Sequence, residues 1–190
     1  MGVQVNPKEI MEAGGPKVKQ DYPDHRKYFL ERMIRENQYK IGAELGVQYG
    51  FTYCHLIETF DDLNMIGVDS WAAKHEMNMP ISDTGESLNK EMYCYLLEWS
   101  KDYGDRVNLI RDYTTEAVKT VPDGSLDFVF VDAGHSFDCA ATDIKEWTPK
   151  VRSGGMVAGH DVNELYVRTA LSLYHPKYSI ANDNCWYVIV

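Results

Sequence analysis

The sequence predicts an α/β fold with a doubly wound, mostly parallel sheet of seven strands that ends in an antiparallel hairpin. Short apolar segments alternate with amphipathic ones along most of the chain. Such alternation is typical of a parallel sheet with helices on both faces. The run Phe-Val-Phe-Val at 128–131 is apolar without a break, as expected of a strand that is buried on both sides.

The elements follow from these patterns in chain order. Asp24 can cap a helix that runs to about Glu36, because the apolar residues at 28, 29, 33 and 34 fall on one helical face. The predicted strands are 41–45, 65–68, 107–110, 127–131, 156–158, 178–181 and 185–190. The predicted helices between them are 52–60, 92–103, 115–120, 137–147 and 163–174. Asn-Asp-Asn at 182–184 forms the turn of the terminal hairpin.

A chain of 190 residues is most simply one domain. We expect an N-terminal arm and capping helix over residues 1–39, followed by the main α/β domain over residues 40–190. Residues 71–87 are polar, contain Pro80 and Gly85, and follow a strand end. We interpret them as a lid or substrate loop, and a disordered insertion is the alternative.

Composition limits the classes of partner. The formal net charge is −10 and the pI about 5.0, which disfavours a nucleic-acid substrate and favours a small neutral or cationic one. The four cysteines are scattered without a metal-finger or disulfide spacing, as in a cytoplasmic protein with reduced thiols. No apolar run has the length that a membrane span needs. A homodimer is left open.

A glycine turn follows the first strand of the predicted sheet. Glu44, Gly46 and Gly50 form the spacing E-x-G-x-x-x-G, and Asp69 ends the next strand. Glycines let backbone N–H groups approach a ligand closely, and an acid at the second strand end can bind ribose hydroxyls. Glu44 would repel a phosphate but attract a cationic amino-acid group. This combination predicts a site for S-adenosylmethionine, and a structural turn without a ligand is the alternative.

Three further residues are predicted to surround the adenine of that cofactor. Trp71 would lie against one face of the base and Tyr113 near the other, with Asp112 close to the exocyclic amine. Both aromatic residues could equally belong to the core.

Polar residues also follow the fourth and fifth strands, as Asp132-Ala133-Gly134-His135 and Gly159-His160-Asp161. Neighbouring parallel strands end at one edge of a sheet, so Asp132, His160 and Asp161 can converge on a divalent cation such as Mg²⁺ or Mn²⁺. His135 is then placed to act as a general base. In the alternative, Asp132 and Asp161 cap the following helices and His160 is a hydrogen-bonded structural residue.

These motifs together resemble the class I S-adenosylmethionine-dependent methyltransferases, which have a Rossmann-like fold. The chain resembles the catechol-type O-methyltransferases, and more closely the macrocin-type sugar O-methyltransferases and cephalosporin-hydroxylase-like proteins. The resemblance covers roughly residues 40–165. It rests on Glu44-Leu45-Gly46 with Gly50, Gly67 to Trp71, Asp127 to Asp132 with His135-Ser136, Asp143, and Ser153-Gly154-Gly155-Met156 with His160-Asp161.

The resemblance implies both the metal site and the base. In the catechol-type enzymes, an acid after strand four and an acidic pair after strand five bind magnesium, and Asp132 and His160-Asp161 match these positions. A catalytic lysine there stands where this chain has His135.

The function we expect is therefore O-methylation of a small hydroxylated molecule. Asp132 and His135 are the expected catalytic residues, Asp132 is also expected to contact S-adenosylmethionine, and a divalent cation is a further cofactor. The alternatives are a metal-independent methyltransferase acting on oxygen or nitrogen, and a non-catalytic binding module. If His135 is structural, His75 is the next candidate for the general base.

Overall fold

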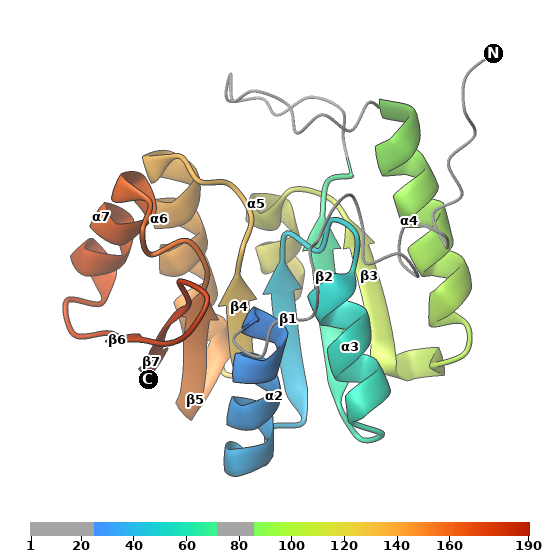
Figure 1. Ribbon diagram of the computed structural model, residues 1–190, viewed down its shortest axis with the longest axis horizontal. Coiled ribbons are helices and arrows are strands. Elements are labelled where there is room, and N and C mark those ends of the chain that lie inside the picture. The colour runs from blue at the N-terminus through green and yellow to red at the C-terminus, as the bar shows by residue number, and fades with distance from the viewer. Residues whose placement is uncertain (1–24, 72–85) are drawn as a thin grey trace.

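The computed structural model describes residues 25–71 and 86–190, and their strands form a single seven-stranded sheet (Figure 1). The strands are β1 (Ile41–Leu45), β2 (Asn64–Asp69), β3 (Val107–Arg111), β4 (Leu126–Val131), β5 (Val151–Gly159), β6 (Ser179–Ile180) and β7 (Trp186–Ile189). Their order across the sheet is β3-β2-β1-β4-β5-β7-β6. Strands β1 to β5 pair in parallel, and β7 is antiparallel to both β5 and β6. The predicted doubly wound sheet and terminal hairpin are confirmed.

Helices cover both faces of this sheet (Figure 1). The first face carries α2 (Arg26–Asn37), α3 (Phe51–Thr59) and α4 (Glu86–Ser100). The second carries α5 (Thr114–Ala117), α6 (Phe137–Trp147) and α7 (Leu165–Tyr174). Strand β1 and helix α6 have the predicted bounds, whereas α4 begins six residues before the expected position 92.

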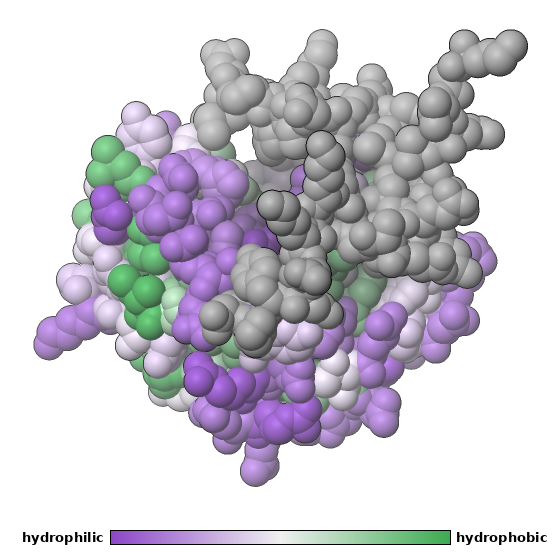
Figure 2. All heavy atoms as spheres, viewed as in Figure 1, coloured by the Kyte–Doolittle hydropathy of each residue, from purple (hydrophilic) through white to green (hydrophobic). Residues whose placement is uncertain are grey.

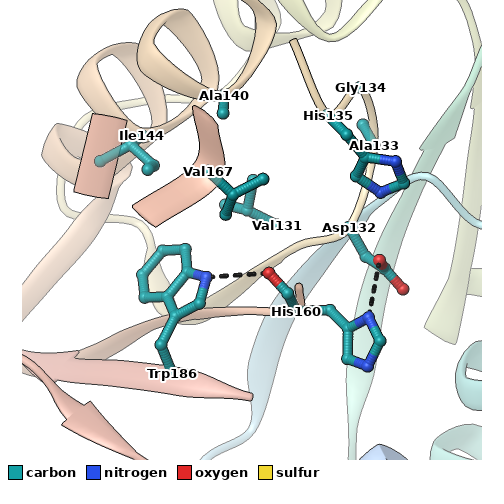
Figure 3. Close-up of a pocket in the computed structure, with 10 residues that line it drawn as sticks. All are labelled: Val131, Asp132, Ala133, Gly134, His135, Ala140, Ile144, His160, Val167 and Trp186. Atoms are coloured by element: carbon teal, nitrogen blue, oxygen red, sulfur yellow. Dashed lines mark hydrogen bonds and ion pairs between the residues drawn. The ribbon is translucent and has the colours of Figure 1, made fainter. Parts of the chain in front are cut away.

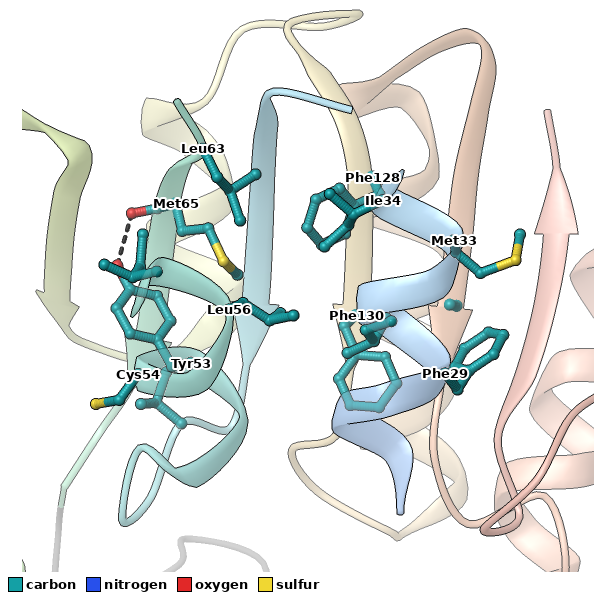
Figure 4. Packing of buried hydrophobic residues seen from close by; sticks show 14 of the residues in the cluster. Phe29, Met33, Ile34, Tyr53, Cys54, Leu56, Leu63, Met65, Phe128 and Phe130 are labelled. Carbon is teal, nitrogen blue, oxygen red and sulfur yellow. Dashed lines mark hydrogen bonds between the residues drawn. The ribbon is translucent and has the colours of Figure 1, made fainter. Parts of the chain in front are cut away.

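Alternate residues of β4 supply the two halves of the core. Phe128 and Phe130 point toward the α2 side, and Val129 and Val131 point toward α6 and α7. Phe29, Met33 and Ile34 of α2 belong to the same buried cluster as the two phenylalanine rings, and Figure 4 shows Ile34 beside Phe128. Burying one such side chain contributes roughly 1.5–3 kcal/mol. Helix α2 is therefore a packed part of the fold.

The start of α2 differs from the prediction. His25 is the N-cap residue, and its Nδ1 accepts a hydrogen bond from the Lys27 backbone N–H at 3.2 Å. The Arg26 backbone N–H donates to Asp183 Oδ2 at 3.0 Å. Asp24, the predicted cap, lies outside the described residues. The hairpin turn near the end of the chain thus fixes the first turn of α2.

Most of the predicted lid, with His75, also lies outside the described residues. Of residues 71–87, Trp71 is buried with 3% of its surface exposed, and Glu86 and Ser87 belong to α4. The described residues contain no helix that is long and apolar enough to cross a membrane. Figure 2 shows a largely hydrophilic face with hydrophobic side chains on the side of α7, where Leu165 and Leu173 are exposed.

Candidate functional site

The turn after β1 depends on its glycines. Gly46 has φ +89°, and a Cβ added there would lie 2.1 Å from the Asp132 carbonyl oxygen. Gly50 has φ +79° at the N-cap of α3, and a Cβ there would lie 2.6 Å from a Leu96 methyl carbon. Side chains at either position would be strained and would clash. The glycines therefore hold the turn against the end of β4. Within the turn, the Gly46 and Gly50 N–H groups donate to the carbonyls of Val68 and Val47.

Glu44 is a buried acid on β1 beside this turn. Its side chain is 3% exposed, and its Oε2 has no hydrogen-bond partner among the described residues. Burial raises the pKa of Glu44 well above its ordinary value, and the carboxylates of Asp132 and Asp69 raise it further against the opposing charge of Arg26. An unpaired carboxyl oxygen in the interior is costly, so this position fits a ligand with a positive charge and N–H donors.

Asp69 ends β2 with both carboxylate oxygens engaged. Oδ2 accepts the Gln48 N–H and Oδ1 accepts the Trp71 N–H, each at 2.8 Å. Each oxygen has a second lone pair. The two backbone donors therefore hold the carboxylate beside the glycine turn.

The aromatic residues predicted to surround the adenine have different environments. The Trp71 ring packs 4.8 Å from the Tyr93 ring, and its Nε1–H donates to the Gln48 carbonyl at 3.0 Å. Tyr113 is 40% exposed at the start of α5, next to Asp112, whose N–H donates to the Asp69 carbonyl at 3.1 Å. The Trp71 side chain is therefore part of the core, whereas the Tyr113 side chain is exposed to solvent.

Asp132 and Asp161 do not cap the following helices. The N-cap of α6 is Ser136, whose hydroxyl accepts the Cys139 N–H at 3.2 Å, and the N-cap of α7 is Glu164. The capping alternative is therefore wrong for both acids. Their carboxylates are directed instead at the two histidines beside them.

Asp161 bridges these histidines. Its Oδ2 lies 2.8 Å from His135 Nε2 and its Oδ1 lies 2.9 Å from His160 Nδ1. Burial raises the pKa of Asp161, but hydrogen bonds from both histidines outweigh it and hold the pKa well below its ordinary range. Figure 3 shows Asp132 with His135 on one side and His160 on the other.

Beside the predicted ligands Asp132, His160 and Asp161, the structure offers a second grouping that includes His135. Ligand atoms of Asp132, His135 and Asp161 all lie within 4.8 Å of one another. His160 lies beside this group, with its Nδ1 2.9 Å from Asp161 Oδ1 and 3.7 Å from Asp132 Oδ1, and its Nε2 3.3 Å from Arg26 Nη1. Two carboxylates and an imidazole suit Mn²⁺, Fe²⁺ or Zn²⁺, so the donor set fits a divalent cation.

Arg26 and Asp183 are site residues that the sequence did not reveal. Arg26 Nε lies 3.3 Å from Asp132 Oδ2, and Asp183 Oδ2 lies 3.8 Å from His160 Nε2. Burial raises the pKa of Asp132 to about 6, against the opposing charges of Arg26 and His160. Neither residue has a local signal, since one begins a helix and the other lies in a hairpin turn.

The cavity in Figure 3 is a separate space behind these side chains. It measures about 10 Å³ and extends from His135 and His160 to Ile144 and Val167, between the strand ends and the α6–α7 side. That volume holds one water molecule. The cofactor site predicted beside Glu44 and Asp69 is thus distinct from this cavity.

Comparison with known proteins identifies the family of this chain. The family described as "Methyltransferase domain" matches residues 43–162, which is more than half of the chain. Among curated proteins, the uncharacterised protein y4gI of Sinorhizobium fredii is 27% identical over 123 residues. That alignment covers 63% of this chain and 13% of the relative.

Solved structures share the fold at low sequence identity. An O-methyltransferase from Bacillus cereus, in complex with SAH, is 12% identical with a TM-score of 0.64, and the alignment covers 100% of this chain and 93% of that one. The O-methyltransferase TomG from Streptomyces achromogenes, in complex with SAM, is 13% identical with a TM-score of 0.62. That alignment covers 97% of this chain and 87% of TomG.

Proposed function

Because this chain belongs to the methyltransferase-domain family, we propose that it is an S-adenosylmethionine-dependent O-methyltransferase that acts on a small hydroxylated molecule. The observation that carries this proposal is the buried, unpaired oxygen of Glu44 beside the glycine turn and the fixed carboxylate of Asp69. S-adenosylmethionine has an ammonium for the first and a ribose for the second, with no phosphate for Glu44 to repel.

His135 is the residue we assign to proton removal. Its side chain is 45% exposed, and its Nε2 contacts Asp161 Oδ2 at 2.8 Å. In the neutral ring Nε2–H donates to that carboxylate, which leaves Nδ1 as the basic nitrogen. The methyl group moves from the sulfonium to the substrate oxygen, and the hydroxyl proton moves to His135. Asp161 orients the imidazole and stabilises its charged form.

A divalent cation, when bound by Asp132, His135 and Asp161, would supply Lewis-acid activation of the substrate hydroxyl. His135 cannot be a ligand through its basic nitrogen and a proton acceptor at the same time. Chelator therefore separates the two versions of the mechanism, because full activity in EDTA leaves His135 as the base.

The test is methyl transfer from labelled S-adenosylmethionine to a panel of sugars, catechols and amines, with and without EDTA. We expect label on a hydroxylated acceptor and none on amines. Cofactor binding without transfer to any acceptor would favour a non-catalytic binding module. Absence of cofactor binding would contradict the proposal.

A further inference from the structure

Arg26 is a cation fixed inside an acidic site. Its guanidinium Nε lies 3.3 Å from Asp132 Oδ2, and its side chain is 30% exposed. Burial lowers the pKa of Arg26, but attraction by Asp132, Glu44 and Asp183 outweighs burial and holds the pKa above its ordinary value. The guanidinium is therefore a permanent positive charge beside the Asp132 carboxylate, and a bound divalent cation would use the same carboxylate.

The backbone of Arg26 is held independently of its side chain. Its N–H donates to Asp183 Oδ2 at 3.0 Å. The next turn of α2 buries Phe29 and Leu30 in the core with 4% and 0% exposed. The guanidinium is thus delivered to the site by a packed helix, and its removal need not release the helix.

The contact with Asp132 is an ion pair without a well-formed hydrogen bond. Arg26 Nε is buried and has no hydrogen-bond partner among the described residues, although the carboxylate lies nearby. Nη1 points to His160 Nε2 at 3.3 Å. Arginine has only donors, so in the neutral ring His160 Nε2 accepts from Arg26 and its Nδ1–H donates to Asp161.

We propose that Arg26 is an internal counter-cation that competes with a divalent metal ion for Asp132. The inference rests on the proposed function for the location of the site. Guanidinium and metal ion require the same carboxylate, and two positive charges a few ångströms apart repel strongly at low dielectric. Removing the guanidinium leaves Asp132 without this counter-charge, so divalent cations should bind more tightly.

The test is Mn²⁺ binding, measured from the free-ion electron paramagnetic resonance signal without S-adenosylmethionine or substrate. We expect Arg26→Gln to bind Mn²⁺ about tenfold more tightly or better than wild type. Arg35→Gln is the matched control, because Arg35 lies on the same helix and pairs with Glu31. It should bind Mn²⁺ as wild type does. Unchanged or weaker binding by Arg26→Gln overturns the proposal.

A second measurement uses the wild-type protein, so it does not depend on whether Arg26→Gln folds. The ¹⁵N resonance of Arg26 Nε, assigned through Arg26→Lys, should shift during titration with diamagnetic Zn²⁺. A resonance that stays unchanged while zinc saturates the site would overturn the competition. Titration with S-adenosylhomocysteine tests the proposed function separately, since loss of cofactor binding would leave the metal result intact.

Discussion

Replacing Asp69 with alanine is the sharpest perturbation of the proposed cofactor site. The carboxylate is held by the N–H groups of Gln48 and Trp71 at 2.8 Å, so its orientation is fixed before any ligand arrives. Its removal leaves two ribose hydroxyls without a charged acceptor, which should cost ~1.5–3 kcal/mol of binding free energy. That loss corresponds to roughly 10–150-fold in affinity.

The same change also affects folding, and the two effects can be separated. The part-buried N–H of Trp71 loses its acceptor, at a cost of about 1–3 kcal/mol in unfolding free energy. Calorimetric titration with S-adenosylhomocysteine reads affinity without turnover, and urea unfolding reads stability. Asp69→Asn keeps one acceptor oxygen and should fall between wild type and alanine in both measurements.

Asp105→Ala is the matched control for this prediction. Asp105 is exposed in the 3-10 helix at 104–106 that precedes β3, at the opposite edge of the sheet from the strand ends. It should bind the cofactor as wild type does. Unchanged affinity in Asp69→Ala, or an equal loss in Asp105→Ala, would refute the assignment of Asp69 to the ribose.

The remaining predictions concern the acids and the base. Glu44→Gln should weaken S-adenosylhomocysteine by roughly 10–150-fold, because a charge-assisted bond is lost, and equal affinity in calorimetry would contradict this. The raised pKa of Glu44 means that the folded protein binds its proton more tightly, so its contribution to stability falls as pH rises above the unfolded value; Glu44→Gln should remove that fall in urea unfolding at pH 5 and pH 7. His135→Ala should lower kcat by ~10²–10⁴ with near-normal cofactor affinity, and full kcat with and without metal would make His135 structural. The hydrogen bond to Asp161 raises the pKa of His135 above its ordinary value, so the rate should rise with pH through an inflection above the pKa of a free histidine. Asp161→Asn should move the inflection to lower pH, and an unmoved profile would assign it to another group.

The fold could be predicted because its main signals are local. The unbroken apolar run at 128–131 identified β4, and the glycine turn after Leu45 separated β1 from α3. Strand β5 was the exception, since it extends to Val151 through Gly154, which has φ +77°. A glycine pair after a serine resembles a turn in sequence, and only the pairing of Val151 with Leu126 reveals a strand there.

The site could be predicted only as far as strand ends determine it. Topology brings Glu44, Asp69, Asp132 and Asp161 to one edge of the sheet, as the alternation implied. Side-chain orientation decides the remainder. His135 joins Asp132 and Asp161 in the group whose ligand atoms lie within 4.8 Å of one another, and Arg26 contacts His160 from a helix 134 residues away in sequence. A local sequence pattern cannot predict a contact between residues so far apart in the chain.

The central claim is that the edge formed by β1 and β2 binds S-adenosylmethionine through Glu44 and Asp69. A crystal structure of the protein with S-adenosylhomocysteine tests it most directly. We predict the ligand's ammonium within hydrogen-bond distance of Glu44 Oε2 and both ribose hydroxyls on the Asp69 carboxylate. A ligand bound elsewhere, or one whose ammonium and ribose avoid both acids, would contradict the account.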